Sequence, residues 1–452
     1  MENNLYIYRE SFLTDFFREE NGPNNSLEYC TEDLIYAICA IGSIIDFGDD
    51  FFMYQGILFD TPEKFYYQAK YLIFQKLNSN SYNEITSIQT LLCLSYFDLG
   101  RGNDLSAWTL AGIAFRIGTF DNFELDPRLT VGNNILNTHL TLTEYEANVK
   151  TRIYWGCVIA DSYISFVLGK SPTLRHLRAT MPHCKNLPFL KGIESFLYFD
   201  PVAKTPIIFN ISRPLEKLNV LYQLANRYHD LVYRDSSSNN GLSTLYYLEK
   251  FNVDIFHWKD SLPRDLYWTK NELKSNGYNI NLMFFRYQYY LILLSFNRDF
   301  IDADNSLDET VSPALICTSA IEDLYTSIQC FSKFHSLKYA SLNMVYLAIL
   351  GIQIVPKLPE NIALTVQKKS LINIFGSVLA EGASVYEIAK DAYEAYLANF
   401  KDLGLKHNIG SRSPDTNRSK HSLNHILAPV SFRDVQETVG FDESLIPSLN
   451  YG

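Results

Sequence analysis

Apolar residues recur every three or four positions through most of this 452-residue sequence, and that spacing fits helices rather than strands. In the stretch EITSIQTLLCLSYFDL, Ile85, Ile88 and Leu92 fall on one stripe, which Tyr96 and Leu99 continue. Alternation with a period of two, the pattern of half-buried strands, is almost absent. The fold class is therefore predicted to be all-α.

The predicted helices follow one another with glycine and proline between them, which is typical of a large array of packed antiparallel helices. A chain of this length can form one extended domain or two closely packed helical halves. We expect the folded region to cover residues 1–400, and the polar, turn-rich residues 401–452 to be a mobile tail. Besides the stretch above and one that begins at residue 107, helices are predicted at residues 34–45, 62–77, 144–168, 214–233, 248–261, 282–296, 313–332, 342–354 and 371–400.

The charge balance limits the partners of this chain. Lysine and arginine number 39 and aspartate and glutamate 50, so the formal net charge is −11. Because the phosphate backbone repels a chain of this charge, we expect no direct nucleic-acid binding by this chain. The seven cysteines are scattered, without a pair at metal-ligand spacing, and we interpret them as reduced thiols of a cytosolic or nuclear protein.

Two features of the sequence argue against export and membrane insertion. The N-terminus carries Glu2 and Arg9 and lacks the basic region followed by an apolar run that a secretory signal needs. The most apolar segments, LIYAICAIGSII and MVYLAILGIQIV, are each shorter than the roughly 20 residues that a membrane-spanning helix needs. We expect a protein that is neither secreted nor bound in a membrane.

The candidate chemical motifs are incomplete. GKS at residues 169–171 imitates the end of a phosphate-binding loop, but Ile164 stands where that loop needs a glycine. His421 and His425 would share a helix face, yet the glutamate of a zinc hydrolase and a third ligand are missing. No serine or cysteine lies in a recognisable catalytic arrangement with a histidine. We therefore expect no enzymatic activity, no bound metal and no cofactor.

One stretch, GRGNDLSAWTLAGIAFRIGTF, combines glycines, two arginines and a tryptophan in an otherwise apolar helical context. Gly100 and Gly102 are predicted to end the preceding helix, because glycine readily adopts the left-handed conformation that follows many helices. Asp104 or Ser106 is expected to cap the helix that comes next.

This stretch and the helix before it resemble the core of the fungal-specific transcription factor regulatory domain, also called the middle homology region. That family commonly has a glutamine before a leucine-rich helix, a Gly-Arg-Gly-like turn, and then a tryptophan, a small residue and an Ala-Arg pair. The residues that fit this pattern are Gln89, Arg101, Gly102, Trp108, Gly112, Ala114 and Arg116, with Phe115 between the last two.

A second block, EYEANVKTRIYWGCVIADSYISFVLGKSPTLR, is similar to the family's acidic start, basic cluster, aromatic-tryptophan pair, central aspartate and terminal Gly-Arg-Pro. It departs from the pattern at Ser162, where an arginine commonly stands, and at Lys170, which replaces the terminal arginine. Weaker similarity continues in FHWKDSLPRDL, YQYYLILLSFNRDFI and CTSAIEDLYTSI, so the likeness covers residues 25–335 and is best at residues 87–172. The matching residues of the second block are Glu144, Glu146, Lys150, Arg152, Trp155, Asp161, Ser165, Gly169 and Pro172.

The residue types of the first block suggest a packing contact. Ala111 and Gly112 offer a small surface on which another helix can approach closely, and Trp108 and Phe115 would fill the space beside it. We predict a tight seam between helices at this point.

The arginines of the two blocks suggest an ion pair. A buried arginine needs a carboxylate or carbonyl partner, so we hypothesise that Arg116 or Arg152 pairs with Asp161. The alternative is a partly exposed arginine whose guanidinium is hydrated.

The resemblance implies a regulatory domain that senses a small-molecule effector or a protein partner and controls an attached DNA-binding module, in which a cysteine cluster binds two zinc ions. No such cluster stands in this sequence. The chain is then a regulator that acts through a partner, a shortened factor, or a helical interaction scaffold such as a kinetochore-complex subunit. The partners expected are an effector, proteins of the transcription machinery and a second copy of the chain, in the nucleus or the cytoplasm.

Overall fold

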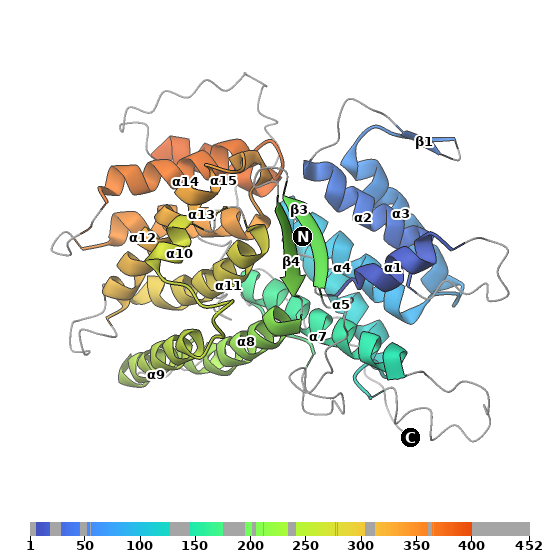
Figure 1. Ribbon diagram of the computed structural model, residues 1–452, viewed down its shortest axis with the longest axis horizontal. Helices are drawn as coiled ribbons and strands as arrows, with labels where there is room; N and C mark the ends of the chain where they lie inside the picture. The colour runs from blue at the N-terminus through green and yellow to red at the C-terminus, as the bar shows by residue number, and fades with distance from the viewer. Residues whose placement is uncertain are drawn as a thin grey trace, which may run out of the picture.

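The computed structural model describes residues 6–18, 29–45, 52–54, 56–126, 144–174, 195–200, 205–210, 212–233, 241–275, 277, 279–302, 312–359, 364 and 366–399. Helices dominate these residues, so the prediction of an all-α fold is confirmed (Figure 1). The α-helices described are α1 (Arg9–Phe16), α2 (Glu32–Ile45), α3 (Pro62–Asn78), α4 (Glu84–Gly100), α5 (Asp104–Phe120), α7 (Glu144–Val167), α8 (Ser212–Tyr233), α9 (Gly241–Asp260), α10 (Lys270–Ser275), α11 (Ile280–Asn297), α12 (Pro313–Phe331), α13 (Leu342–Ile354), α14 (Lys368–Gly382) and α15 (Glu387–Asn399).

The predicted helix bounds need two corrections. The helix expected at residues 371–400 is two helices, because the chain turns after Gly382, where the amides of Val385 and Tyr386 both donate to the Gly382 carbonyl. The helix expected from residue 248 begins at Gly241. Three short 3-10 helices are described as well. Arg298–Phe300 lies between α11 and α12, Leu337–Tyr339 between α12 and α13, and Val355–Lys357 between α13 and α14.

Two antiparallel hairpins interrupt the helices, and the sequence pattern did not predict them. Strands β1 (Phe52–Tyr54) and β2 (Ile57–Phe59) pair across a turn in which Gly56 has a φ of +77°. Strands β3 (Ser195–Asp200) and β4 (Thr205–Asn210) form the second hairpin. The short pair offers only three residues a strand, and SFLYFD runs apolar through its centre, so neither shows an alternation with a period of two.

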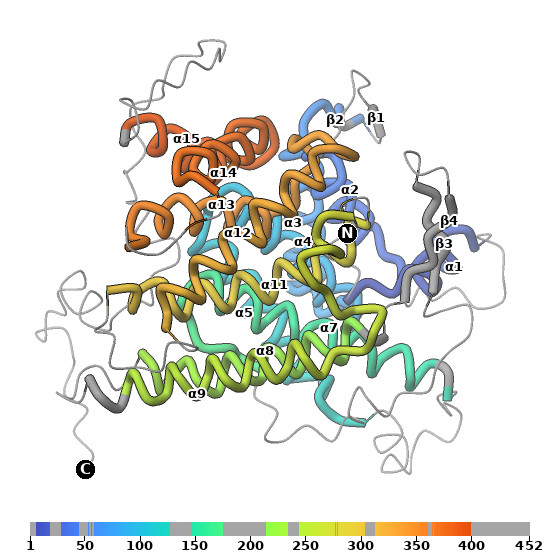
Figure 2. The backbone as a smooth tube through the Cα atoms, turned by 60° about the vertical axis from the view of Figure 1, so that its left-hand side comes forward, coloured from blue at the N-terminus to red at the C-terminus, as the bar shows by residue number. Residues whose placement is uncertain are grey.

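The centre of the molecule is built from helices that are buried on most sides. Helix α4 packs against α2, α3 and α5, whereas α11 packs against α8, α9, α12 and α13. Figure 2 shows α8 and α9 side by side along one edge, with α11 between them and the C-terminal helices. Helix α15 also contacts α4, so the C-terminal end of the described chain packs against a helix of the N-terminal half. The buried apolar side chains form one contiguous cluster that runs from Tyr6 to Tyr396.

The C-terminal helices approach one another through glycines that face aromatic rings. A Cβ atom added to Gly351 of α13 would lie 2.5 Å from Cε2 of Phe375 in α14. A Cβ atom added to Gly376 of α14 would lie 2.8 Å from Cζ of Tyr396 in α15. These rings occupy the space that any larger residue would need, which fixes the distance between the helices.

No helix among the residues described above is both long enough and apolar enough to cross a bilayer.

The Gly351→Ala variant tests the packing of α13 against α14. The added methyl group must displace the buried ring of Phe375, so we expect the free energy of unfolding to fall by about 1–3 kcal/mol. Urea denaturation followed by circular dichroism measures this change.

The matched control is Gly42→Ala, because Gly42 lies within α2 and an added Cβ atom meets nothing within 4 Å there. Alanine favours a helix over glycine by up to about 1 kcal/mol, so this variant should be neutral or more stable than the wild type. Equal losses in both variants would contradict the packing explanation.

Candidate functional site

The turn between α4 and α5 is organised by Asp98, whose side chain is 2% exposed. Its Oδ2 atom accepts hydrogen bonds from the Tyr66 hydroxyl of α3 at 2.8 Å and from the Ser106 hydroxyl of α5 at 2.5 Å. The prediction that Asp104 or Ser106 caps α5 is wrong, because Asn103 holds the N-cap position and Ser106 bonds to Asp98. One buried carboxylate thus ties three helices together.

The Gly-Arg-Gly turn meets the far end of the chain. Gly102 has a φ of +67°, as predicted for a glycine that follows a helix, whereas Gly100 is still helical and packs closely. A Cβ atom added to Gly100 would lie 2.9 Å from Cδ1 of Tyr386. The Arg101 guanidinium forms ion pairs with Glu63 of α3 and, at 3.5 Å, with Glu387 of α15. Arg101 therefore joins the N-terminal helices to the C-terminal ones.

Helix α5 buries Ala111 and Phe115, as the predicted seam requires, but it makes no close approach at Gly112. This glycine is only half-buried, and an added Cβ atom would meet nothing nearer than the Arg116 side chain at 3.5 Å. Trp108 is likewise partly exposed beside the core, and Arg116 is exposed. The close approach lies one and a half turns later, at Gly118, where an added Cβ atom would be 3.2 Å from Ile88 of α4.

The second block forms α7 and the turn that ends it. Gly169 has a φ of +62°, and the Lys170 amide donates to the Ser165 carbonyl at 2.7 Å, which closes the end of the helix. Pro172 lies in the segment that then folds back along α7. The Leu174 amide of that segment donates to Oδ2 of Asp161 at 2.6 Å. Asp161 therefore anchors the chain that leaves the helix.

The predicted ion pair with Asp161 is absent from the described residues. Its carboxylate is 1% exposed and is held by the Leu174 and Thr173 amides and the Ser165 hydroxyl. Burial raises the pKa of Asp161 to about 6, and these hydrogen bonds offset only part of that rise. Arg152 is buried and donates to the Asn148 carbonyl of its own helix instead.

Two further family residues serve the core. The Gln89 side chain of α4 donates to the Tyr6 carbonyl at 2.7 Å, which holds the N-terminal segment against this helix. Trp155 of α7 is 4% exposed, and its ring meets Tyr154 edge to face. In the two blocks with the best family similarity, Gln89, Arg101 and Asp161 therefore hold helices and turns in place.

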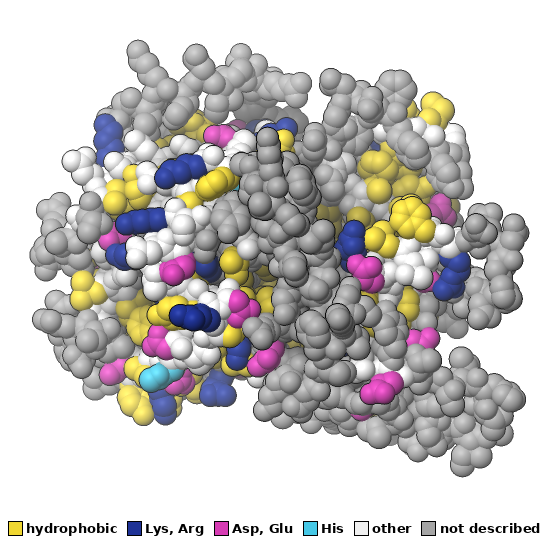
Figure 3. Space-filling view, in the orientation of Figure 1, with side chains coloured by type: hydrophobic (Ala, Val, Ile, Leu, Met, Phe, Trp, Pro, Cys, Tyr) yellow, Lys and Arg dark blue, Asp and Glu magenta, His cyan; other side chains and the backbone are white. Residues whose placement is uncertain are grey.

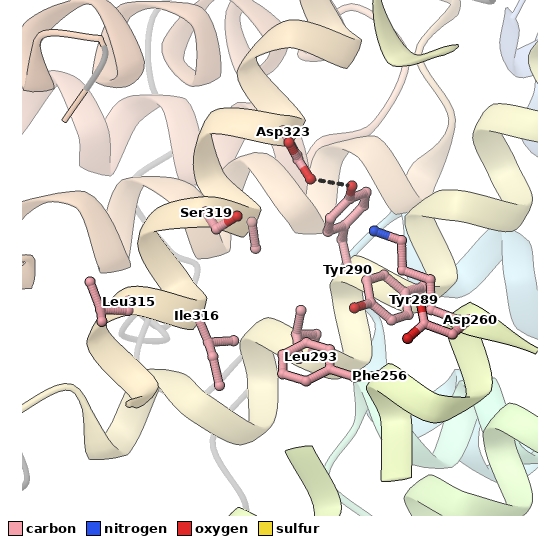
Figure 4. Close-up of a pocket in the computed structure, with 11 residues that line it drawn as sticks. Phe256, Asp260, Tyr289, Tyr290, Leu293, Leu315, Ile316, Ser319 and Asp323 are labelled. Atoms are coloured by element: carbon pink, nitrogen blue, oxygen red, sulfur yellow. Dashed lines mark hydrogen bonds between the residues drawn. The ribbon is translucent and has the colours of Figure 1, made fainter. Parts of the chain in front are cut away.

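A cleft of about 360 Å³ opens between α9, α11 and α12. Figure 4 shows Leu293, Leu315 and Ile316 along one end and Asp323 with Tyr290 at the other. The Tyr290 hydroxyl donates to Oδ2 of Asp323 at 2.9 Å and accepts from the Trp268 indole. The cleft is thus apolar at one end and polar at the other.

The polar end of the cleft holds charges of both signs. Burial lowers the pKa of the Lys259 ammonium and raises the pKa of the Asp323 carboxyl, and each charge partly offsets the shift of the other. The Lys259 ammonium lies 4.9 Å from the centre of the Trp268 ring and 5.6 Å from that of Tyr289. Asp260 adds a second carboxylate at the exposed end of α9.

Sequence reasoning missed the cleft, although it noted the stretches that build it. The three stretches of weaker family similarity supply Lys259 and Asp260, then Tyr289 and Tyr290, then Asp323. The structure shows that these three stretches, which are separate in the sequence, line the same cleft. Among the described residues, no group of three or more histidine, cysteine or acidic side chains could hold a metal, and His421 and His425 lie outside those residues.

Comparison with known proteins identifies the family. The sequence profile of the fungal specific transcription factor domain matches residues 3–275. The chain belongs to this family. No solved structure matches it.

Named members of the fungal transcription factor family are similar to most of this chain. It is 32% identical to the activatory protein CHA4 of Saccharomyces cerevisiae, over 86% of this chain and 57% of that protein. It is 32% identical to the TY1 enhancer activator of the same yeast, over 79% of this chain and 44% of that protein. The nitrogen assimilation transcription factor nit-4 of Neurospora crassa is 26% identical over 75% of this chain and 30% of that protein. The chain spans about half the length of the first two relatives.

Two substitutions at Asp161, an aspartate of the family pattern, separate its hydrogen bonds from its charge. Asparagine keeps an acceptor for the Leu174 amide, whereas alanine leaves that amide without one. We expect Asp161→Ala to unfold at a free energy about 1–3 kcal/mol below that of Asp161→Asn. Urea denaturation at neutral pH measures the difference, and equal stability of the two variants would exclude the anchoring role.

The pH dependence of Asp161→Asn tests the buried charge. The pKa of Asp161 is about 6 in the folded protein and about 4 in an unfolded chain. The folded state therefore binds the proton more tightly, and the wild type gains stability relative to Asp161→Asn as the pH falls through that window, by up to about 3 kcal/mol. A difference that stays constant between about pH 7 and pH 4 would show that the carboxylate is not penalised by burial.

Proposed function

We propose that this chain is the regulatory region of a fungal transcription regulator, and that an effector or a protein partner controls its activity. Membership of the fungal transcription factor family supports regulation of transcription. The relatives are named as activators and transcription factors, which favours a role without catalysis. The observation that carries control by an effector is the cleft between α9, α11 and α12, which charged side chains line at one end and apolar side chains at the other.

We further propose that residues 1–400 act as one regulatory domain in the nucleus and that this chain does not contact DNA directly. The net charge of −11 supports this, because the phosphate backbone repels it. DNA is then recognised by a partner protein, by a partner bound to a second copy of this chain, or by residues beyond this chain. Proteins of the transcription machinery receive the regulatory signal.

A reporter assay tests control by an effector. The chain is fused to an unrelated DNA-binding domain in yeast, and reporter output is compared across growth media and added metabolites. We expect the output to change with at least one condition. A coupling of about 1–3 kcal/mol between effector and activity would change the response about 5–150-fold.

The Ser319→Trp variant connects that response to the cleft. Ser319 lines the cleft from the exposed face of α12, so a tryptophan there fills the cleft without entering the core. We expect this variant to hold the reporter at one level in all conditions. Gln329→Trp is the control, because Gln329 is exposed on the same helix but does not line the cleft. A response that survives in Ser319→Trp would place control elsewhere.

The competing function is a protein-interaction scaffold, and one surface favours it. Tyr67 and Tyr71 of α3 are 65% and 57% exposed, and with Phe74 they line a shallow hollow. Figure 3 shows hydrophobic side chains gathered on the right of the molecule, over the region where Figure 1 places α2 and α3. Exposed aromatic side chains that cluster in this way are typical of a protein contact.

The double variant Tyr67→Ser with Tyr71→Ser distinguishes the two functions. Both side chains are exposed, so the stability of the protein should change by less than about 0.5 kcal/mol. If α3 docks a partner, reporter output falls while the response to an added metabolite keeps its ratio. If output and response both stay at the wild-type level, this face of α3 takes no part in transcription.

A further inference from the structure

Two opposite charges share one cleft but do not pair with each other. Within the described residues, no hydrogen bond or ion pair engages the Lys259 ammonium, whose contacts are the rings of Trp268 and Tyr289. Asp323 is 9% exposed, and its Oδ1 atom is buried without a hydrogen-bond partner, since only Oδ2 accepts from Tyr290. A buried polar atom that lacks a partner is costly. Both side chains line the same cleft.

Charges of both signs act on Lys259, because the Asp323 and Asp260 carboxylates raise the pKa of its ammonium and the Arg286 guanidinium lowers it. The Arg286 guanidinium is buried and lies 5.7 Å from the centre of the Trp268 ring, so this indole contacts two cations. Arg286 contributes to the lowered pKa of Lys259, after the larger effect of burial. A carboxylate next to Lys259 would reduce this repulsion, and the Tyr289 hydroxyl on the same wall could donate to it.

The charge on Asp323 favours a cation or a hydrogen-bond donor at the other side of the polar end. Oδ1 can only accept while the carboxyl is ionised. A protonated amine beside Asp323 would also be attracted by the Asp260 carboxylate, which lines the same cleft. The apolar end, lined by Leu293, Leu315 and Ile316, would receive an uncharged group.

We propose that this cleft binds a small zwitterionic molecule, with its carboxylate on Lys259, its protonated amine on Asp323 and an aliphatic group at the apolar end. This inference rests on the proposed function, and it names the class of effector. The volume of about 360 Å³ is at the low end of the range for ligand pockets, which limits the ligand to a small molecule.

Fragments of one probe test which charges matter. The full chain is titrated with L-alanine, L-valine, L-leucine and L-methionine, and with two fragments of leucine: 3-methylbutylamine, which lacks the carboxylate, and 4-methylpentanoate, which lacks the amine. Thermal shift and calorimetry report binding. We expect saturable stabilisation by at least one aliphatic amino acid and binding at least about tenfold weaker for each fragment, since each loses a charge-assisted hydrogen bond.

Variants connect the binding to the two charges. Lys259→Met and Asp323→Asn should each weaken binding of the same amino acid about tenfold or more, whereas Lys259→Arg keeps the positive charge and should retain most of the affinity. Lys250→Met is the control, because Lys250 is an exposed lysine of the same helix that does not line the cleft. The fragment comparison uses the wild-type protein, so it remains decisive if a variant fails to fold.

Three results would overturn the zwitterion assignment: no binding by any of the four amino acids, equal binding by either fragment, or binding that Lys259→Met and Asp323→Asn leave unchanged. The reporter assay separates this failure from failure of the proposed function. If the reporter still responds to growth conditions and Ser319→Trp abolishes the response, the cleft senses a different class of ligand. If the amino acid binds but the reporter never responds, the binding site stands and control by an effector does not.

Discussion

A helix that is buried on most sides must find a partner inside the protein for each polar side chain it carries, because water cannot reach it. Helix α4 meets this constraint in part: three of its polar side chains join it to other segments, whereas the hydroxyls of Thr86 and Ser87 are buried without a hydrogen bond. Gln89 holds the N-terminal segment, Ser95 donates to the Ala107 carbonyl of α5, and Asp98 joins α3 to α5. These three side chains hold the N-terminal segment, α3 and α5 against α4.

The same constraint makes the cleft unusual. On α11, Tyr290 donates to Asp323 and accepts from Trp268, so this part of the polar end is complete. The Lys259 ammonium, unlike the Tyr290 hydroxyl, forms no hydrogen bond among the described residues. It lies over the rings of Trp268 and Tyr289, which attract a cation through their π-electrons. Other buried polar atoms of this protein also lack a hydrogen bond, but Lys259 and Asp323 carry opposite charges and line one cleft. That shared position is the physical basis for assigning a ligand there.

Much of the fold was accessible to sequence reasoning, because the spacing of apolar residues locates most helices and glycines such as Gly102 and Gly169 mark their ends. The contacts between helices could not be predicted from the sequence. Gly112 has the right neighbours for a seam, yet the close approaches occur at Gly118 and Gly351, where the ring or helix that faces the glycine comes from another part of the chain. The cleft was missed for the same reason. The role of Asp98 could have been predicted, because a carboxylate on an apolar helix just before a turn indicates a buried acceptor of hydrogen bonds from neighbouring helices.

The contact of Arg101 with Glu387 has a consequence for how the protein folds. The α4–α5 turn emerges during synthesis long before α15 exists, so Gly100 and Arg101 first face solvent. Contacts between residues so distant in the chain form late, because closing a long loop costs entropy before the contact returns any free energy. Until α15 is synthesised, the surface of the N-terminal helices around Gly100 and Arg101 stays exposed to solvent. In a chain cut before α15, that surface would remain exposed. Such a fragment would be a natural client for chaperones.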